Sequence, residues 1–187
     1  MENYRNEDEG LSNRTSERRV LTGMFRDRQS TENAYNALHE RGYDKDDINL
    51  VMSDDTRKTH YGDDVADQTE IGTKAAEHAG KGSAIGGTLG AIAGVVAAIG
   101  TSVVIPGLGL LIAGPIAAGL AGAGAGGLAG GIIGALVGSG IPEARAKLYE
   151  SGIKEGNVVI SVTPKNEEDA RYLEENWRNN RGEEIHW

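Results

Sequence analysis

The stretch NVVISVT at residues 157–163 is the clearest strand in this chain of 187 residues, because four of its seven residues are valine or isoleucine. The next stretch, residues 166–182, predicts a helix, with Asn166 placed to cap its first turn and Gly182 to end it. Residues 183–187 (EEIHW) predict a last short strand. The C-terminal end of the chain therefore has the predicted order strand, helix, strand.

The same order precedes it near the N-terminus. Residues 20–25 (VLTGMF) predict a buried strand. Residues 30–42 (STENAYNALHERG) predict a helix capped by Ser30 and ended by Gly42, and residues 47–53 (DINLVMS) predict a second strand. Each half has only two strands and one helix, too little to bury a core alone. We therefore expect the halves to combine into one α+β domain with the ferredoxin-like (split βαβ) order β-α-β-β-α-β.

These expectations divide the chain into five parts. Residues 1–18 are predicted to be a disordered polar tail, 19–55 the first half of the α+β domain, and 142–187 its second half. Between the halves we expect a connector over 56–81, preceded and overlapped by a mobile polar stretch at 54–70, and a helical hairpin over 82–141. A further helix is predicted from Pro142, closed by Gly152. It belongs either to the exit from the hairpin or to the sheet, as a third helix packed on it.

The segment from residue 82 to residue 142 contains no charged residue, no histidine and no aromatic residue, and it holds 19 of the 28 glycines. Glycine costs about 1 kcal/mol relative to alanine inside a helix, so glycines repeated every four residues need a compensating contact. Small residues at this spacing let two helix backbones approach closely. The glycines expected at such contacts are Gly82, Gly86, Gly90, Gly94, Gly122, Gly126, Gly130, Gly134 and Gly138.

Prolines and glycines divide this segment into two predicted helices, about 83–105 and 116–138. The residues expected in the hairpin turn are Pro106, Gly107, Gly109 and Pro115. The stretches 85–105 and 116–137 both have about the 20 residues needed to cross a bilayer, so a membrane-inserted hairpin is one interpretation. Two absences count against a full crossing: no Trp or Tyr lies at the expected interfaces, and the turn carries no polar residue. In the other interpretation, the glycines pack helices between subunits of a soluble oligomer.

Composition also narrows the chemistry. A net charge of −9 argues against nucleic acid as a partner. With no cysteine, the chain has neither disulfides nor thiolate metal sites. The first ten residues, MENYRNEDEG, lack the apolar stretch of a secretory signal. No acids, bases, nucleophiles or metal ligands converge in the sequence, so we expect no enzyme, no cofactor, no metal and no small-molecule substrate.

Three stretches resemble the family of bacterial heat-induced, or general stress, proteins with a glycine-zipper insert. They are VLTGMFRDRQSTENAYNALHERGY (20–43), IPGLGLLIAGPIAAGLAG (105–122) and GIPEARAKLYESGIKEGNVVISV (140–162). The resemblance implies a stress-associated bacterial protein and brings no catalytic residues with it. It leaves the mechanism open.

From these features we expect a non-enzymatic stress-response protein that forms homo-oligomers. The hairpin would insert or assemble at the cytoplasmic membrane with lipid as a partner, and the polar domain would stay in the cytoplasm. Lys74 and Lys81 before the segment, and Arg145 and Lys147 after it, fit that orientation. The alternatives are a soluble cytoplasmic scaffold packed through the same helices, and a sensor that binds a small ligand on the α+β domain.

Overall fold

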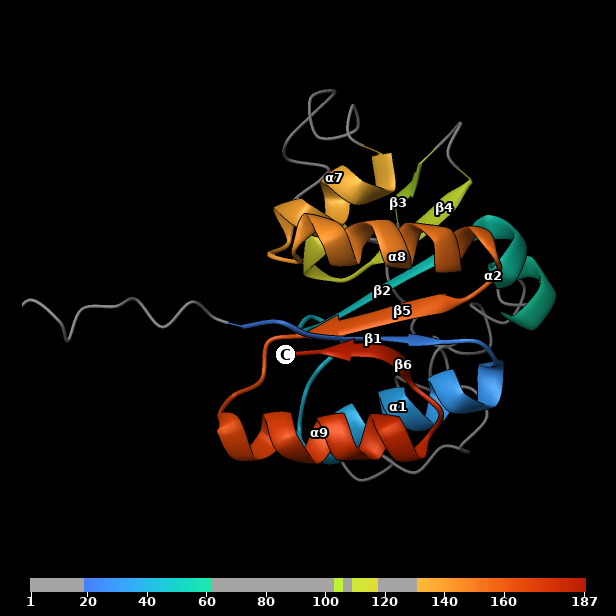
Figure 1. Ribbon diagram of the computed structural model, residues 1–187. Coiled ribbons are helices and arrows are strands. Elements are labelled where there is room, and N and C mark those ends of the chain that lie inside the picture. Colours follow the sequence, from blue (N-terminus) through green and yellow to red (C-terminus); the bar gives the residue numbers. More distant parts are fainter. Residues whose placement is uncertain (1–18, 62–102, 106–108, 118–130) are drawn as a thin grey trace, which may run out of the picture.

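The computed structural model describes residues 19–61, 103–105, 109–117 and 131–187. The strands are β1 (Leu21–Phe25), β2 (Ile48–Ser53), β3 (Val103–Ile105), β4 (Leu110–Ala113), β5 (Val158–Val162) and β6 (Glu183–His186). The helices are α1 (Arg28–Glu40), α2 (Asp54–Tyr61), α7 (Gly131–Gly138), α8 (Glu143–Lys154) and α9 (Glu167–Asn179). The strands form one antiparallel sheet in the order β3-β4-β2-β5-β1-β6, so the fold is mixed α+β (Figure 1).

Strand β5 joins the two halves of the chain. It pairs with β1 on one side, where Val162 lies opposite Leu21, and with β2 on the other, where Val162 lies opposite Ile48. Strands β1 and β2 do not touch each other in the sheet, since β5 lies between them. The strands expected at 20–25 and 157–163 are therefore neighbours in one sheet.

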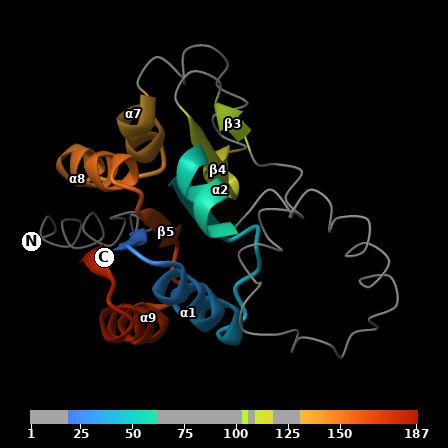
Figure 2. The ribbon, with the colours of Figure 1, turned by 90° about the vertical axis from the view of Figure 1, so that its right-hand side faces the viewer.

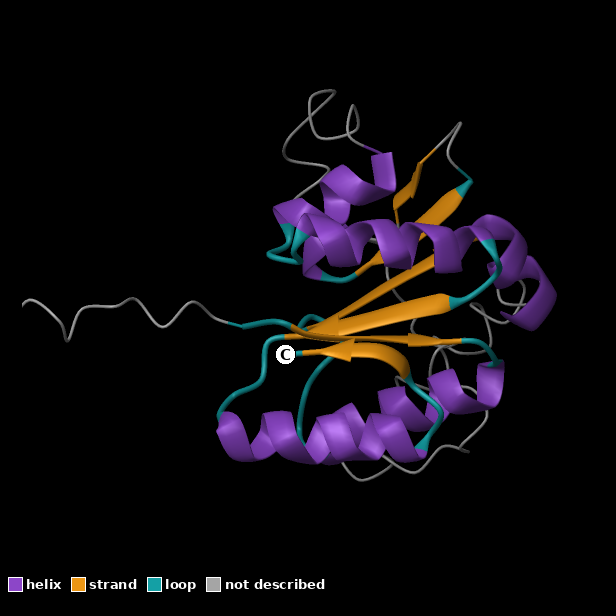
Figure 3. Ribbon diagram, in the orientation of Figure 1, coloured by secondary structure: helices purple, strands orange, loops and turns teal. Residues whose placement is uncertain are grey.

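Helices cover both faces of this sheet (Figure 3). Helices α1 and α9 lie together on one face, below the sheet in Figure 1. Trp177 of α9 is fully buried there, edge-on to Phe25 with ring centroids 5.6 Å apart. Its indole nitrogen donates a hydrogen bond to the carbonyl oxygen of Ala34 on α1. One side chain thus ties both helices to β1.

Helices α7 and α8 lie on the opposite face, as the side view in Figure 2 shows. The third-helix alternative for residues 142–151 is therefore the one observed: α8 packs on the sheet through Ala146, Tyr149 and Ile153. It also runs past Gly152 to Lys154, so the prediction that Gly152 ends this helix is wrong. Gly152 is instead a packing position, because a methyl group there would overlap the Sδ atom of Met24 on β1.

Helix ends follow local hydrogen bonding. Asn166 caps α9 as expected, accepting a hydrogen bond from the backbone of Asp169 at 2.8 Å. Helix α1 begins earlier than expected: its cap is Asp27, and Ser30 donates to Asp27 from both its backbone nitrogen and its hydroxyl, each at 2.8 Å. Gly42 follows the end of α1 with φ of +74°, the left-handed conformation that favours glycine.

Residues 54–61 were expected to be part of a mobile connector, but they form α2. Ser53 explains the start of this helix, since its hydroxyl accepts a hydrogen bond from the backbone of Thr56 at 3.0 Å. Asp54 in the first turn then pairs with Arg57 and Lys58. A run of polar residues therefore encodes a helix through its cap and its charge pairs.

The expected helical hairpin is also corrected where the structure describes it. Residues 103–105, predicted as the end of a helix, form β3, and part of the predicted turn forms β4. In the second predicted helix, residues 115–117 make one helical turn and residues 131–138 form α7. Across residues 19–61, 103–105, 109–117 and 131–187, no helix has both the length and the apolar character that a membrane crossing requires.

Candidate functional site

The residues singled out from the sequence are only partly described. Gly134 and Gly138 lie on α7, Gly109 immediately precedes β4, and Pro115 begins the helical turn at 115–117. The others lie outside the described residues: Gly82, Gly86, Gly90, Gly94, Pro106, Gly107, Gly122, Gly126 and Gly130.

Among the described residues, no helix approaches the two glycines of the rows that lie on α7. A methyl group added at Gly134 or Gly138 would meet no atom of those residues within 4 Å. Helix α7 packs through Ile132, Ala135 and Leu136 instead, all of which are buried. Within the described part of the chain, the glycine side of α7 therefore has no helix pressed against it.

The turn after β4 depends on a glycine that the sequence reasoning missed. Gly114 has φ of +95°, and a methyl group there would overlap the carbonyl oxygen of Ile48. The next helical turn is held by the side chain of Asn49, whose oxygen accepts a hydrogen bond from the backbone of Ile116 at 2.8 Å. The Gly-Pro pair at 114–115 is the signal that could have located this turn.

Two described parts of the uncharged segment, residues 110–117 and 132–141, contribute to the core on the same face of the sheet. Strand β4 pairs with β2, where Ile112 lies opposite Val51. The apolar residues of these two parts join sheet residues Val51 and Val159 in one buried cluster. Those residues are Leu110, Ile112, Ile116, Ala117, Ile132, Ala135, Leu136 and Ile141. The uncharged segment thus supplies much of the core on this face.

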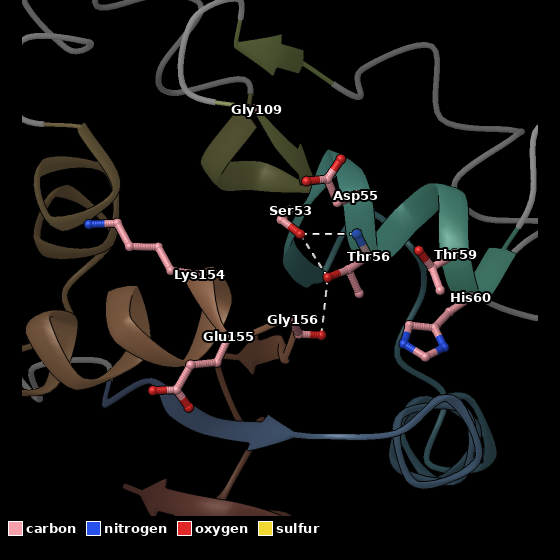
Figure 4. Close-up of a pocket in the computed structure, with 9 residues that line it drawn as sticks. All are labelled: Ser53, Asp55, Thr56, Thr59, His60, Gly109, Lys154, Glu155 and Gly156. Carbon is pink, nitrogen blue, oxygen red and sulfur yellow. Dashed lines mark hydrogen bonds between the residues drawn. The ribbon is translucent and has the colours of Figure 1, made fainter.

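A polar pocket of about 410 Å³ lies beside this anchor, where α2, the turn after α8 and the residue before β4 meet (Figure 4). It is lined by Ser53, Asp55, Thr56, Thr59, His60, Gly109, Lys154, Glu155 and Gly156. Sequence reasoning did not bring these residues together, because they come from three parts of the chain.

Hydroxyl groups at the centre of the pocket are used to join its walls. The hydroxyls of Ser53 and Thr56 are 2.7 Å apart, and the Thr56 hydroxyl donates to the carbonyl oxygen of Gly156 at 3.1 Å. The side chains of Lys154 and Glu155 extend away from this centre in Figure 4. These hydrogen bonds connect α2 to the turn that enters β5, so the hydroxyl groups stabilise the fold at this point.

The pKa shifts in the described residues also have structural causes, namely burial and local hydrogen bonds. Burial raises the pKa of Tyr35, Tyr61 and Tyr149, so these hydroxyls stay neutral at physiological pH. Side-chain hydrogen bonds from Lys58 and Arg57 lower the pKa of Asp54. No three His, Cys, Asp or Glu side chains of the described residues are placed to hold a metal ion.

The four histidines are not brought together by the described structure. The ring of His39 lies against Tyr35 on α1, His60 lines the pocket, and His186 is on β6. His78 lies outside the described residues.

Comparison of the chain with protein-family models, with curated proteins and with solved structures found no match.

Proposed function

We propose that the chain is a non-enzymatic bacterial stress-response protein that self-associates through its glycine-rich segment, which is tied to a ferredoxin-like α+β domain through residues 110–117 and 132–141. The order β2-β5-β1-β6 supports the ferredoxin-like part of this proposal, together with α1 and α9 on one face of the sheet. The resemblance of residues 20–43, 105–122 and 140–162 to bacterial stress proteins supports the setting.

The observation that carries the proposal is the anchoring of the uncharged segment. Ile116 and Ala117 are engaged in the domain, as is α7 through Ile132, Ala135 and Leu136, which leaves only residues 118–130 between Ala117 and α7 from the second expected span. These 13 residues fall well short of the roughly 20 that cross a bilayer as a helix. The anchoring therefore favours contact between copies over the two-helix crossing considered from the sequence.

Residues 82–102 remain the longest uncharged stretch outside the anchored elements. They contain Gly82, Gly86, Gly90 and Gly94 in register, the spacing that lets a helix approach a copy of itself. The same stretch is the part with which the protein would attach to the cytoplasmic membrane if lipid were its partner. The same stretch must therefore be tested both for contact with a second copy and for attachment to the membrane.

The test replaces Gly86, Gly90, Gly126 and Gly130 with leucine in the full chain, and with alanine in a matched control. Leucine should prevent close helix approach, whereas alanine should preserve it. We expect light scattering after gel filtration to show smaller particles for the leucine variant and wild-type particles for the alanine variant. Unchanged particle mass in the leucine variant would overturn the proposal.

Fractionation of expressing cells gives the second readout. If carbonate washing does not release the wild type and only detergent extracts it, the glycine-rich segment attaches the protein to lipid, and the proposed contact between copies is wrong. Leucine makes the segment more apolar, so the leucine variant would then bind membranes at least as well as the wild type.

A further inference from the structure

Helix α8 carries an apolar stripe that faces outward. Its buried side consists of Ala146, Tyr149 and Ile153, which pack on the sheet. On the other side Ala144, Leu148 and Ser151 are exposed at spacings of four and three residues. Leu148 is the most exposed of the large hydrophobic side chains of the described residues, at 48%. Such a residue in line with two small ones suits contact with another helix.

A row of alternating charges runs along one flank of this stripe: Glu143, Lys147, Glu150 and Lys154. Within one copy they form two ion pairs, Glu143 with Lys147 at 2.7 Å and Glu150 with Lys154 at 3.1 Å. The signs run −, +, −, + toward the C-terminal end. Read in the reverse direction the same row runs +, −, +, −, so the row is complementary to its own reversed copy.

We infer that two copies of this chain pair through α8 in antiparallel orientation, about a two-fold axis beside Leu148. In a two-fold contact the same surface is used by both copies, so the charged flank of one copy meets the charged flank of the other. One register then places Glu143 opposite Lys154 of the second copy and Lys147 opposite Glu150 of the second copy. That register also brings the two Leu148 side chains together at the centre.

We assign this surface to a second copy of the chain because the row of charges is complementary to the same row in an antiparallel copy. A parallel copy related by a two-fold axis would place the two charge rows on opposite edges of the contact, so no ion pairs could form between the rows. This contact lies outside the glycine rows, so it goes beyond the function proposed above and does not depend on it.

A cysteine cross-link tests the contact in the full chain. The chain has no cysteine, so Leu148→Cys introduces the single thiol. Two cysteines beside the axis should react with each other on mild oxidation or with a short bis-maleimide. The matched control is Arg171→Cys on α9, on the other face of the sheet, where the arginine side chain is 73% exposed. We expect covalent dimers at low protein concentration for Leu148→Cys only. Equal cross-linking of the two variants would overturn the inference.

Charge reversal tests the orientation in the same Leu148→Cys background. Glu143→Lys alone and Lys154→Glu alone should each slow cross-linking, on the order of tenfold, since two symmetric pairs become repulsive. The double variant restores the pairs between copies, although within each helix it turns both ion pairs into pairs of like charges. Recovery of cross-linking in the double variant therefore supports the contact between copies. A double variant that cross-links more slowly than both single variants would contradict it.

The leucine variant of the glycine rows separates this contact from the proposed function. Leu148→Cys should still cross-link in that background, even if the larger assembly is lost. Loss of the cross-link there would show that α8 pairing requires the glycine rows, and would overturn the independent contact inferred here.

Discussion

At the scale of single residues, two glycines in helices occupy opposite environments. Gly152 of α8 lies against Met24, and the amide of Asn157 would be 3.2 Å from an added methyl group. At Gly134 of α7, no atom of the described part of the chain lies within 4 Å of that position. Alanine stabilises a helix relative to glycine by about 1 kcal/mol at both positions. The two substitutions therefore differ only in packing, because within the described structure the added methyl group clashes at Gly152 and not at Gly134.

We therefore predict that Gly152→Ala lowers the free energy of unfolding by up to about 2 kcal/mol, because overpacking the core on that face costs about 1–3 kcal/mol and alanine regains about 1 kcal/mol of helix stability. Gly134→Ala, its matched control, should raise the free energy of unfolding by up to about 1 kcal/mol. Urea denaturation followed by circular dichroism measures both. A stabilised Gly152→Ala variant would mean that Met24 moves aside at little cost.

Asp27 provides a prediction that depends on pH. The backbone hydrogen bond from Ser30 is the main cause that lowers the pKa of its carboxyl group. A lowered pKa in the folded state means that the carboxylate stabilises the fold above its unfolded pKa, near 4, and that this contribution is lost as the pH falls through the folded value. Asp27→Ala should cost about 1 kcal/mol at pH 7, the usual value of an N-cap.

The difference between wild type and Asp27→Ala should stay constant from about pH 7 to pH 5 and shrink below about pH 4. Asp27→Asn is the control, since it keeps a capping oxygen without a charge, and its stability relative to Asp27→Ala should not vary with pH. Thermal unfolding across this range provides the measurement. A cost for Asp27→Ala that is the same at pH 3 and pH 7 would rule out the ionised cap.

At the scale of elements, the sequence predicts those with a clear local signal. Strand β5 is rich in β-branched residues, and α9 combines a capping Asn166 with the helical stripe of Ala170, Leu173 and Trp177. Strands β3 and β4 were misassigned because short apolar runs within an uncharged segment have no periodicity that separates strand from helix. What decides the conformation of β4 is pairing with β2, a contact with a distant part of the chain, and β3 then pairs with β4.

The pocket beside α2 escaped prediction for the same reason. Thr56 and Gly156 are 100 residues apart in the sequence, and only the fold brings their hydroxyl and carbonyl groups together. The glycine rows were visible in the sequence, but the residues that the structure describes give Gly134 and Gly138 no close neighbour. Spacing alone can suggest such a contact, but it cannot show which surface completes it.

Anchoring of the uncharged segment can be tested through β4. Ile112 is fully buried in the core on one face, whereas Trp177 is buried on the opposite face. Ile112→Ala should lower the free energy of unfolding by about 2–5 kcal/mol. The change should be visible in the fluorescence of Trp177, in a Trp187→Phe background, because the sheet unfolds as a unit.

The matched control is Val137→Ala in the same uncharged segment, where the valine is 43% exposed. It should change the free energy of unfolding by no more than about 0.5 kcal/mol. If Ile112→Ala left the unfolding of Trp177 unchanged, β4 would not be part of the core that the rest of the sheet shares.

At the scale of the whole molecule, the order of strands makes the two halves of the chain depend on each other. The first half supplies β1 and β2, which are not neighbours, and β5 of the second half pairs with both of them. In the second half, β5 has no partner strand unless the first half is present, because its two neighbours are β1 and β2. The sequence could predict that the halves combine, since neither has enough elements for a core.

This interdependence predicts that the chain survives a cut between its halves. A protease site placed within residues 62–81 would leave β1 and β2 on one fragment and the other four strands on the second. The glycine rows all lie on the second fragment, so they cannot hold the two fragments together. We expect the fragments to co-migrate in native gel filtration and to separate in urea. After separation each fragment alone should lose the circular dichroism signal of the sheet, and mixing them without urea should restore it. Separation of the fragments immediately after cleavage, without denaturant, would contradict the pairing of β5 with both β1 and β2.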